Sequence, residues 1–194
     1  AGFDIVCANL TSRNQALNDL IKPCIIRNVA GVKVGIFGLI VPTLDRISNV
    51  DDKVTVAQDV LRVAAFQARQ LRSMGAQMVM ALTHIGTELD MQLAETVEGI
   101  DLVVGGHTHD YLFKKVVGPM GRERIVVHAG AGGTKVGILR FDFNGQIRNP
   151  HWELVTVDAS LEPDPKVEAF LAPYAKEYNQ RLSVPIGKTL TPLD

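Results

Sequence analysis

Three histidines occupy positions from which they could bind a metal ion together. His84 ends one apolar run of the sequence, and His107 and His109 follow the next apolar run along the chain. In an open parallel sheet, ligands bind beyond the carboxyl ends of the strands, so strands ending here would place all three rings at one edge. Imidazole is the commonest protein ligand for metals of the Zn, Mn and Fe class. The sequence therefore indicates a metal site at His84, His107 and His109.

The residues around the histidine doublet favour a site that the backbone approaches closely. Gly105 and Gly106 precede the doublet and allow a sharp turn of the chain. Asp110 follows it and could accept a hydrogen bond from one of the rings. His128 ends a later apolar run and could lie near the same edge, while His151 lies inside another run. A lone histidine in such a position is usually solvated or structural, so we expect neither to be a ligand.

A second glycine-rich segment, residues 130–133, has two possible roles. Its backbone N–H groups could cradle a phosphate, which makes Gly130 a candidate at the edge of a substrate site. The segment lacks the Lys-Ser/Thr ending of a P-loop. A tight turn between two strands is the more frequent role of such a sequence.

Alternating strands and helices are expected to position these residues. Residues 34–40 and 77–83 are apolar on both faces, which is typical of interior strands of a parallel sheet. Apolar residues from Ala57 to Leu71 recur at helical spacing, and Gly75 follows as a C-cap. In order, we expect strands at residues 3–9, 23–29 and 33–41, this helix, a strand at 77–83, a helix at 88–97 and a strand at 101–104. This is a βαβ pattern with a parallel sheet.

The second half of the chain has a different pattern. Strands are expected at residues 112–117, 124–128, 135–143 and 146–157, and Asn144-Gly145 is the strongest short signal for a hairpin. An antiparallel meander should therefore follow the parallel unit. Asp164-Pro165 opens a helix that runs to Leu182, and Pro173 should kink or split it. The fold class is α/β (α+β).

Composition sets outer bounds on function. The 194 residues are 46% apolar and 21% charged, with a net charge of -1, as in an ordinary globular protein. No Lys/Arg cluster gives a nucleic-acid footprint, and the apolar runs are too short to span a bilayer. Cys7 and Cys24 are too few for a disulfide scaffold, and the sequence leaves open whether they pair.

Several of these motifs occur together in one known pattern. Thr83-His84-Ile85-Gly86, then Asp90, then Gly-Ile-Asp-Leu-Val-Val-Gly-Gly-His-Thr-His at residues 99–109 resemble the 5'-nucleotidase branch of the calcineurin-like metallophosphoesterases. The resemblance extends over nearly the whole chain. It implies part of a four-layer αββα sandwich and a centre of two divalent metal ions, such as Mn or Zn. By this resemblance His84 and His107 bind one metal and His109 binds the other.

The chain departs from the family pattern in one respect. The family's Asp-x-His, Gly-Asp and Gly-Asn-His-Glu/Asp motifs, which supply the other ligands and the catalytic histidine, do not occur here. We expect them upstream of Ala1, so no catalytic residue is expected within this chain. Residues 1–160 would be the C-terminal part of the metallophosphoesterase domain. Residues 161–194 would be a helix and linker towards a further, nucleotide-gripping domain.

The resemblance implies a metal-dependent phosphoester hydrolase of the 5'-nucleotidase type, present as a fragment. Its substrate would be a nucleotide or a related phosphate ester, and its location the periplasm or cell surface. The isolated chain should have little or no activity, because three neutral imidazoles hold two cations poorly without carboxylates. Relatives that act as 2',3'-cyclic nucleotide phosphodiesterases, UDP-sugar hydrolases or thiosulfohydrolases are alternatives. A non-catalytic half-domain that acts as a binding module is another.

Overall fold

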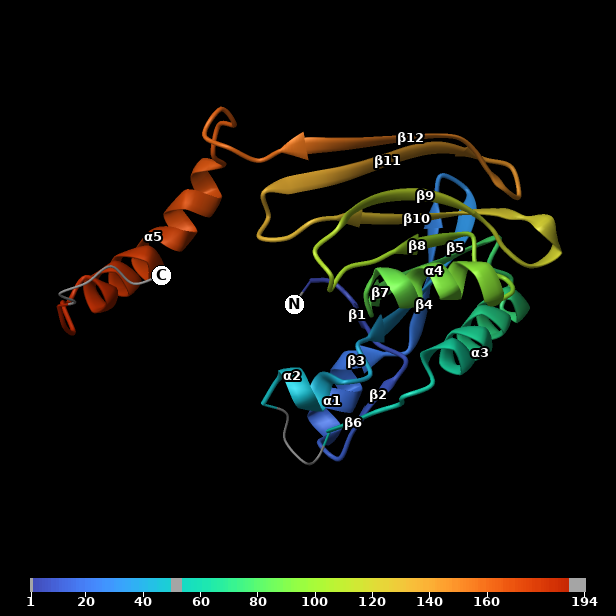
Figure 1. Cartoon of the computed structure of the whole chain (residues 1–194), viewed down its shortest axis with the longest axis horizontal. Coiled ribbons are helices and arrows are strands. Elements are labelled where there is room, and N and C mark those ends of the chain that lie inside the picture. Colours follow the sequence, from blue (N-terminus) through green and yellow to red (C-terminus); the bar gives the residue numbers. More distant parts are fainter. Residues whose placement is uncertain (1, 50–53, 189–194) are drawn as a thin grey trace. The chain divides into compact units, whose positions relative to one another are not determined.

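The computed structural model describes residues 2–49 and 54–188. The chain divides into two compact units, Ala1–Thr156 and Val157–Asp194 (Figure 1). The first unit contains the candidate site. The second contains one long helix.

A six-stranded mixed sheet is the centre of the first unit. Its order is β4-β5-β7-β8-β10-β9. Strands β5, β7, β8 and β10 are mutually parallel, and β4 and β9 are antiparallel at the two edges. The bounds are β4 Cys24–Val29, β5 Val32–Ile40, β7 Met78–His84, β8 Leu102–Val104, β9 Tyr111–Val117 and β10 Glu123–Ala129. The expected hairpin of β4 and β5 and the parallel βαβ unit are confirmed.

Two helices cover one face of this sheet, α3 (Val60–Ser73) and α4 (Thr87–Thr96) (Figure 1). Leu71 of α3 and Leu93 of α4 are fully buried against Val79, Val103 and other side chains on that face. Helix α3 begins at Val60 rather than at Ala57, because the Asp59 side chain accepts a hydrogen bond from the Arg62 N–H and caps it.

A two-stranded sheet of β11 (Lys135–Phe143) and β12 (Ile147–Thr156) packs over the other face. Met78, Leu102 and Ile125 fill this second core, because successive side chains of a strand point to opposite faces. Gly137 lies against the Trp152 indole, where a Cβ would overlap the ring. The first unit therefore has three layers in the order α, β, β, which agrees with part of the expected four-layer sandwich.

Short elements lie at the amino-terminal end of the first unit. Strand β1 (Ile5–Val6) pairs in parallel with β3 (Ile21–Lys22), and β2 (Leu10–Ser12) pairs with β6 (Val54–Val56). Helices α1 (Gln15–Leu20) and α2 (Leu44–Ile47) and the 3₁₀ turn η1 (Pro119–Gly121) complete the unit. The Asn9 side chain, which is buried, joins this region to β5 through hydrogen bonds with the Ile40 N–H (2.9 Å) and carbonyl (2.7 Å). Cys7 and Cys24 are free thiols and both are half-buried.

Two strand predictions need correction. The strand expected at residues 3–9 is only Ile5–Val6. The expected meander is also wrong for β10, which inserts between β8 and β9 and pairs in parallel with β8. Residues 124–128 of β10 are all buried, and such a strand belongs in a sheet interior. Strand β9 carries Lys114 and Lys115 and takes the edge, where charged side chains are favourable.

The second unit contains α5 (Pro165–Leu182), which Asp164 caps by accepting from the N–H groups of Lys166 and Val167. The helix continues through Pro173, so the split, one of the two expected effects, is wrong, and the kink stays a prediction. A proline removes only one hydrogen-bond donor, and the helical turns on either side persist. None of the described helices is long and apolar enough to cross a membrane. The roles expected for residues 1–160 and 161–194 stay predictions.

Candidate metal site

His84 is the last residue of β7 and lies beside Ile40 of β5 in parallel register. Its side chain is exposed at the carboxyl edge of the sheet. Gly86 then turns the chain into α4 with a φ of 90°, a value that glycine adopts easily. A Cβ at Gly86 would lie 3.1 Å from the Thr108 methyl carbon, so the turn packs tightly against the histidine doublet.

The loop after β8 brings His107 to His84. The Gly86 N–H donates to the Gly106 carbonyl at 3.1 Å, which ties the loop to the end of β7. A Cβ at Gly106 would lie 3.3 Å from the His84 Nδ1, so a glycine permits this approach. The two imidazole rings lie edge to face with centroids 5.1 Å apart. His107 is half-buried and His109 is exposed.

A cluster of two hydroxyls and a carboxylate holds this loop. The Thr87 and Thr108 hydroxyls both donate to Asp110 Oδ2, the latter at 2.7 Å. These bonds lower the pKa of the Asp110 carboxyl. We call Thr87, Thr108 and Asp110 the hydroxyl clamp. Asp110 thus bonds to the loop and the start of α4, whereas the sequence suggested a bond to an imidazole.

The hydroxyl clamp restrains a backbone segment of unusual conformation. His107 and His109 both have positive φ values, 90° and 63°. L-residues rarely adopt such values, and each costs of order 1–3 kcal/mol unless its surroundings enforce it. The clamp includes Thr108, which lies between the two histidines, and so helps to hold this strained segment.

A buried polar pair lies beneath the loop. Asp90 of α4 has no exposed surface, and its two oxygens accept from the Thr83 hydroxyl (2.6 Å) and from His128 Nε2 (2.9 Å). His128 is 2% exposed. Sequence reasoning missed this pair. The available signal was Asp90 itself, because it shares a helical face with Leu93, Ala94 and Val97.

The donors at the edge fit part of a metal site. Partial desolvation of the exposed ring, followed by the nearby charges of His107 and His109, lowers the pKa of His84, so the neutral ring with an available lone pair is favoured at pH 7. His84 and His107 are close enough to serve as two ligands of one ion. Within residues 2–49 and 54–188, no three or more His, Cys, Asp or Glu side chains are grouped to hold a metal ion. The assignment of His84, His107 and His109 as a ligand set therefore stays a prediction.

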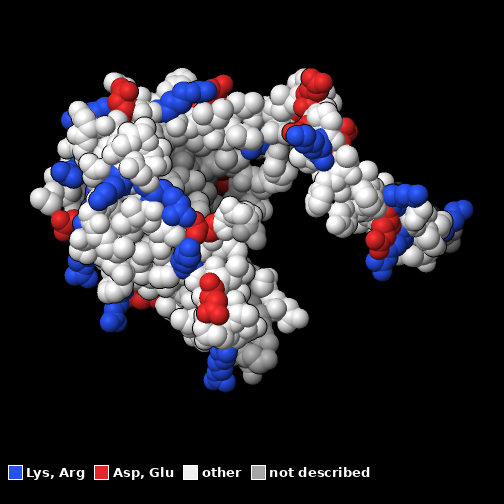
Figure 2. Space-filling view, turned by 180° about the vertical axis from the view of Figure 1, so that it is seen from behind, with Lys and Arg blue, Asp and Glu red and all other residues white. Residues whose placement is uncertain are grey.

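Gly130 and His151 are the remaining candidates from the sequence. The Gly130 N–H donates to the Asp110 carbonyl at 2.9 Å, which extends the pairing of β9 and β10, and a Cβ there would overlap the Tyr111 ring. A role of Gly130 at the edge of a substrate site stays a prediction. His151 is exposed on β12. On the face shown in Figure 2, basic and acidic side chains are interspersed over the described surface.

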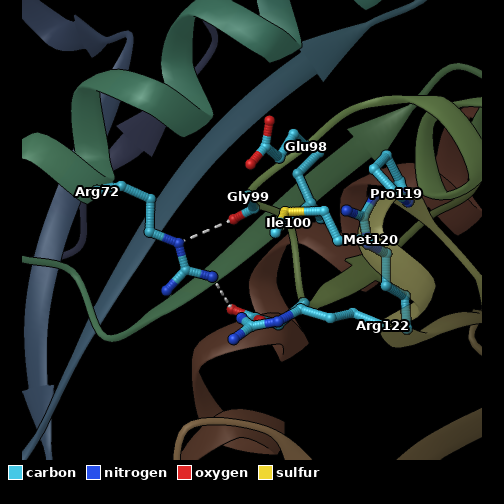
Figure 3. A pocket seen from close by; sticks show the side chains of 9 residues that line it. Arg72, Glu98, Gly99, Ile100, Pro119, Met120 and Arg122 are labelled. Carbon is cyan, nitrogen blue, oxygen red and sulfur yellow. Dashed lines mark hydrogen bonds and ion pairs between the residues drawn. The ribbon is translucent and has the colours of Figure 1, made fainter.

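A cavity of about 290 Å³ lies at the opposite edge of the sheet, where β8 and β10 begin (Figure 3). Arg72 donates from Nε to the Gly99 carbonyl at 3.1 Å and forms an ion pair with Asp101. Arg124 donates to two carbonyls at the end of α4, those of Ala94 and Val97. These arginines join the ends of α3 and α4 to the sheet, so their role here is structural.

Comparisons with known proteins concern the fold and the relatives of the chain. No protein-family model matches the chain. The 5'-nucleotidase of Bos taurus is 26% identical over 99% of this chain and 37% of its own length. The crystal structure of a 5'-nucleotidase precursor from Thermus thermophilus superposes with a TM-score of 0.81 at 27% identity, over 93% of this chain and 38% of that one. The calcineurin-like phosphoesterase YfkN of Bacillus subtilis superposes with a TM-score of 0.70 at 20% identity, over 95% of this chain and 65% of that one.

The fold is thus that of the calcineurin-like phosphoesterases. Within that class, the relatives of this chain include the 5'-nucleotidases. The chain spans less than two fifths of the length of the bovine and Thermus relatives. The fold class expected from the sequence and the resemblance to the 5'-nucleotidases are confirmed.

Proposed function

We propose that this chain supplies His84, His107 and His109 to a two-metal hydrolase of the 5'-nucleotidase type. The observation that carries the proposal is the 5.1 Å separation of the His84 and His107 rings at the carboxyl edge of parallel strands. The substrate we propose is a nucleotide or a related small phosphate ester. By the same resemblance, the location would be the periplasm or cell surface.

Two divalent cations such as Mn or Zn would polarise the phosphoryl group and neutralise its developing charge. In this proposal, the role of this chain is to bind and orient the two cations. His84 is fixed by the end of β7, and His107 by the loop that the hydroxyl clamp restrains. The candidate ligands include no carboxylate, so they add no negative charge to offset two cations. We therefore propose that the remaining ligands and the catalytic histidine lie upstream of Ala1, and that the isolated chain has little or no activity.

Metal titration of the chain tests the ligand assignment. We expect calorimetry with Mn²⁺ or Zn²⁺ to show binding that weakens at least tenfold in His84→Ala and in His107→Ala. His151→Ala is the matched control, because this histidine is exposed on β12, which belongs to the other sheet. Equal binding by His84→Ala and the parent would instead favour the non-catalytic binding module.

Hydrolysis assays of the whole polypeptide that contains this chain test the substrate. A panel of nucleoside monophosphates, 2',3'-cyclic nucleotides, UDP-sugars and a thiosulfonate distinguishes the 5'-nucleotidase activity from its three alternatives. We expect nucleoside monophosphates to be preferred and His84→Ala to reduce turnover in the presence of Mn²⁺. Turnover that His84→Ala and His107→Ala leave unchanged would refute the proposal.

A further inference from the structure

The carboxylate of Asp90 joins three separate parts of the candidate site. One oxygen accepts from Thr83, the residue before His84 at the end of β7. The other oxygen accepts from His128 at the end of β10. The backbone N–H of Asp90 donates to the Gly86 carbonyl at 3.0 Å, within the turn that leads from β7 into α4. One buried side chain therefore links the end of β7, the start of α4 and the end of β10.

The loop that carries His107 rests on the Asp90–His128 hydrogen bond. A Cβ at Gly105 would overlap both Asp90 Oδ2 and His128 Nε2, so the loop backbone lies directly against the two bonded atoms. The Gly105 N–H also donates to the carbonyl of Val127, the neighbour of His128, at 2.9 Å. A shift of the pair must displace Gly105 and, two residues later, His107.

Packing alone does not explain a histidine at position 128. Because a carboxylate oxygen can only accept, the Nε2 of His128 must carry the hydrogen in its 2.9 Å contact with Asp90 Oδ2. Its Nδ1 is buried with no partner among the described residues. A buried polar atom without a partner destabilises the folded state, and a leucine of similar size would avoid this penalty. The hydrogen bond to Asp90 is the compensating interaction.

We propose that His128 is a positioning residue for the His84 and His107 rings and acts through Asp90. Among the described residues, its side-chain hydrogen bond is to Asp90, and the structure records no ring contact between it and His84 or His107. Its hydrogen bond fixes the carboxylate to which Thr83 is tied and against which Gly105 rests. The consequence for metal affinity rests on the proposed function, whereas the effect on ring geometry can be measured without metal.

Two substitutions at position 128 separate the hydrogen bond from packing. His128→Leu fills the space without a donor. His128→Gln keeps a donor, because its amide nitrogen can occupy the place of the imidazole Nε2. Val126→Ala is the matched control. Val126 is fully buried on the same strand and packs in the core under the same helices. Its replacement therefore removes packing but no hydrogen bond to Asp90.

The first readout is the nuclear Overhauser effect between the His84 and His107 ring protons in the metal-free chain. We expect it in the parent, in His128→Gln and in Val126→Ala, and expect it to weaken or vanish in His128→Leu. The second readout is Mn²⁺ affinity, which should fall about 10- to 100-fold in His128→Leu and little in His128→Gln, the usual effect of removing a partner behind the ligands. Thermal unfolding reports stability separately for each variant.

The outcomes separate this inference from the proposed function. A folded His128→Leu with the parent's ring contact and metal affinity would overturn it, as would an equal loss of ring contact in Val126→Ala. A parent that shows the His128-dependent ring contact but binds no metal would refute the proposed function and leave the positioning role standing. If His128→Leu does not fold, Thr83→Val, with Thr83→Ser as the rescue, tests the same carboxylate by the same readouts.

Discussion

Replacing Gly105 by alanine probes the contact on which the candidate site rests. The new methyl group would overlap Asp90 Oδ2 and His128 Nε2, so the loop must lift or the pair must separate. Overpacking of this kind costs about 1–3 kcal/mol. Weakening a hydrogen bond to a charged group costs roughly 1.5–3 kcal/mol. A single displacement of the loop both relieves the overlap and weakens the hydrogen bond, so the two costs do not add in full. We expect the free energy of unfolding to fall by about 3 kcal/mol.

Urea unfolding followed by circular dichroism measures this loss. With a slope of about 2 kcal/mol per molar urea, the midpoint should fall by about 1.5 M. Mn²⁺ affinity should fall with it, because Gly105 leads into His107. Gly2→Ala is the matched control, since a Cβ there has nothing within 4 Å. A Gly105→Ala chain with the parent's midpoint and metal affinity would show that the loop does not rest on the buried pair.

Three further predictions concern other parts of the structure. Thr87→Val removes a hydroxyl donor from the hydroxyl clamp, so the pKa of Asp110 should rise toward its ordinary value in a carboxyl NMR titration. Thr87→Ser should restore the lowered pKa. An unchanged pKa in Thr87→Val would contradict the clamp. Leu93→Ala leaves a cavity at a fully buried position and should lower the free energy of unfolding by about 2–5 kcal/mol, measured by urea unfolding. Leu82→Ala, at a residue that is 44% exposed, should lower it much less. Equal losses would refute the assigned core. Burial raises the pKa of the Cys7 thiol, so less thiolate forms at pH 7. Iodoacetamide should therefore react slowly with Cys7 until the pH is raised. Reaction as fast as that of the amino acid cysteine in solution would be inconsistent with this burial.

Local patterns were sufficient for much of the fold. The apolar periodicity before Gly75 predicted α3, and Asn144-Gly145 predicted the hairpin of β11 and β12. These elements depend on neighbouring residues, whose spacing is visible in the sequence. The ends of β7 and β8 could likewise be located from the sequence. Since parallel strands end at one edge, His84 and His107 could be expected to meet, and their rings do lie close together.

Strand order and burial of polar groups depended on contacts between distant residues. The hairpin turn between β9 and β10 suits an ordinary meander equally well, so the turn does not indicate that β10 inserts between β8 and β9. The only local hints are the apolar run of β10 and the lysines of β9. Nor does the short α4 pattern reveal that Asp90 finds its donor in His128, 38 residues away. Such a pairing depends on which strand lies beside the helix.

The sequence by itself therefore determined the residue types at the site and the strand ends that carry them. The tertiary structure alone determined how they are held. The positive φ values of His107 and His109, the hydroxyl clamp and the buried Asp90–His128 pair all arise where β7, α4, β10 and the loop after β8 meet. The physical reason is that these restraints act between side chains that only the folded sheet brings together, and a buried carboxylate is tolerated only where donors converge on it.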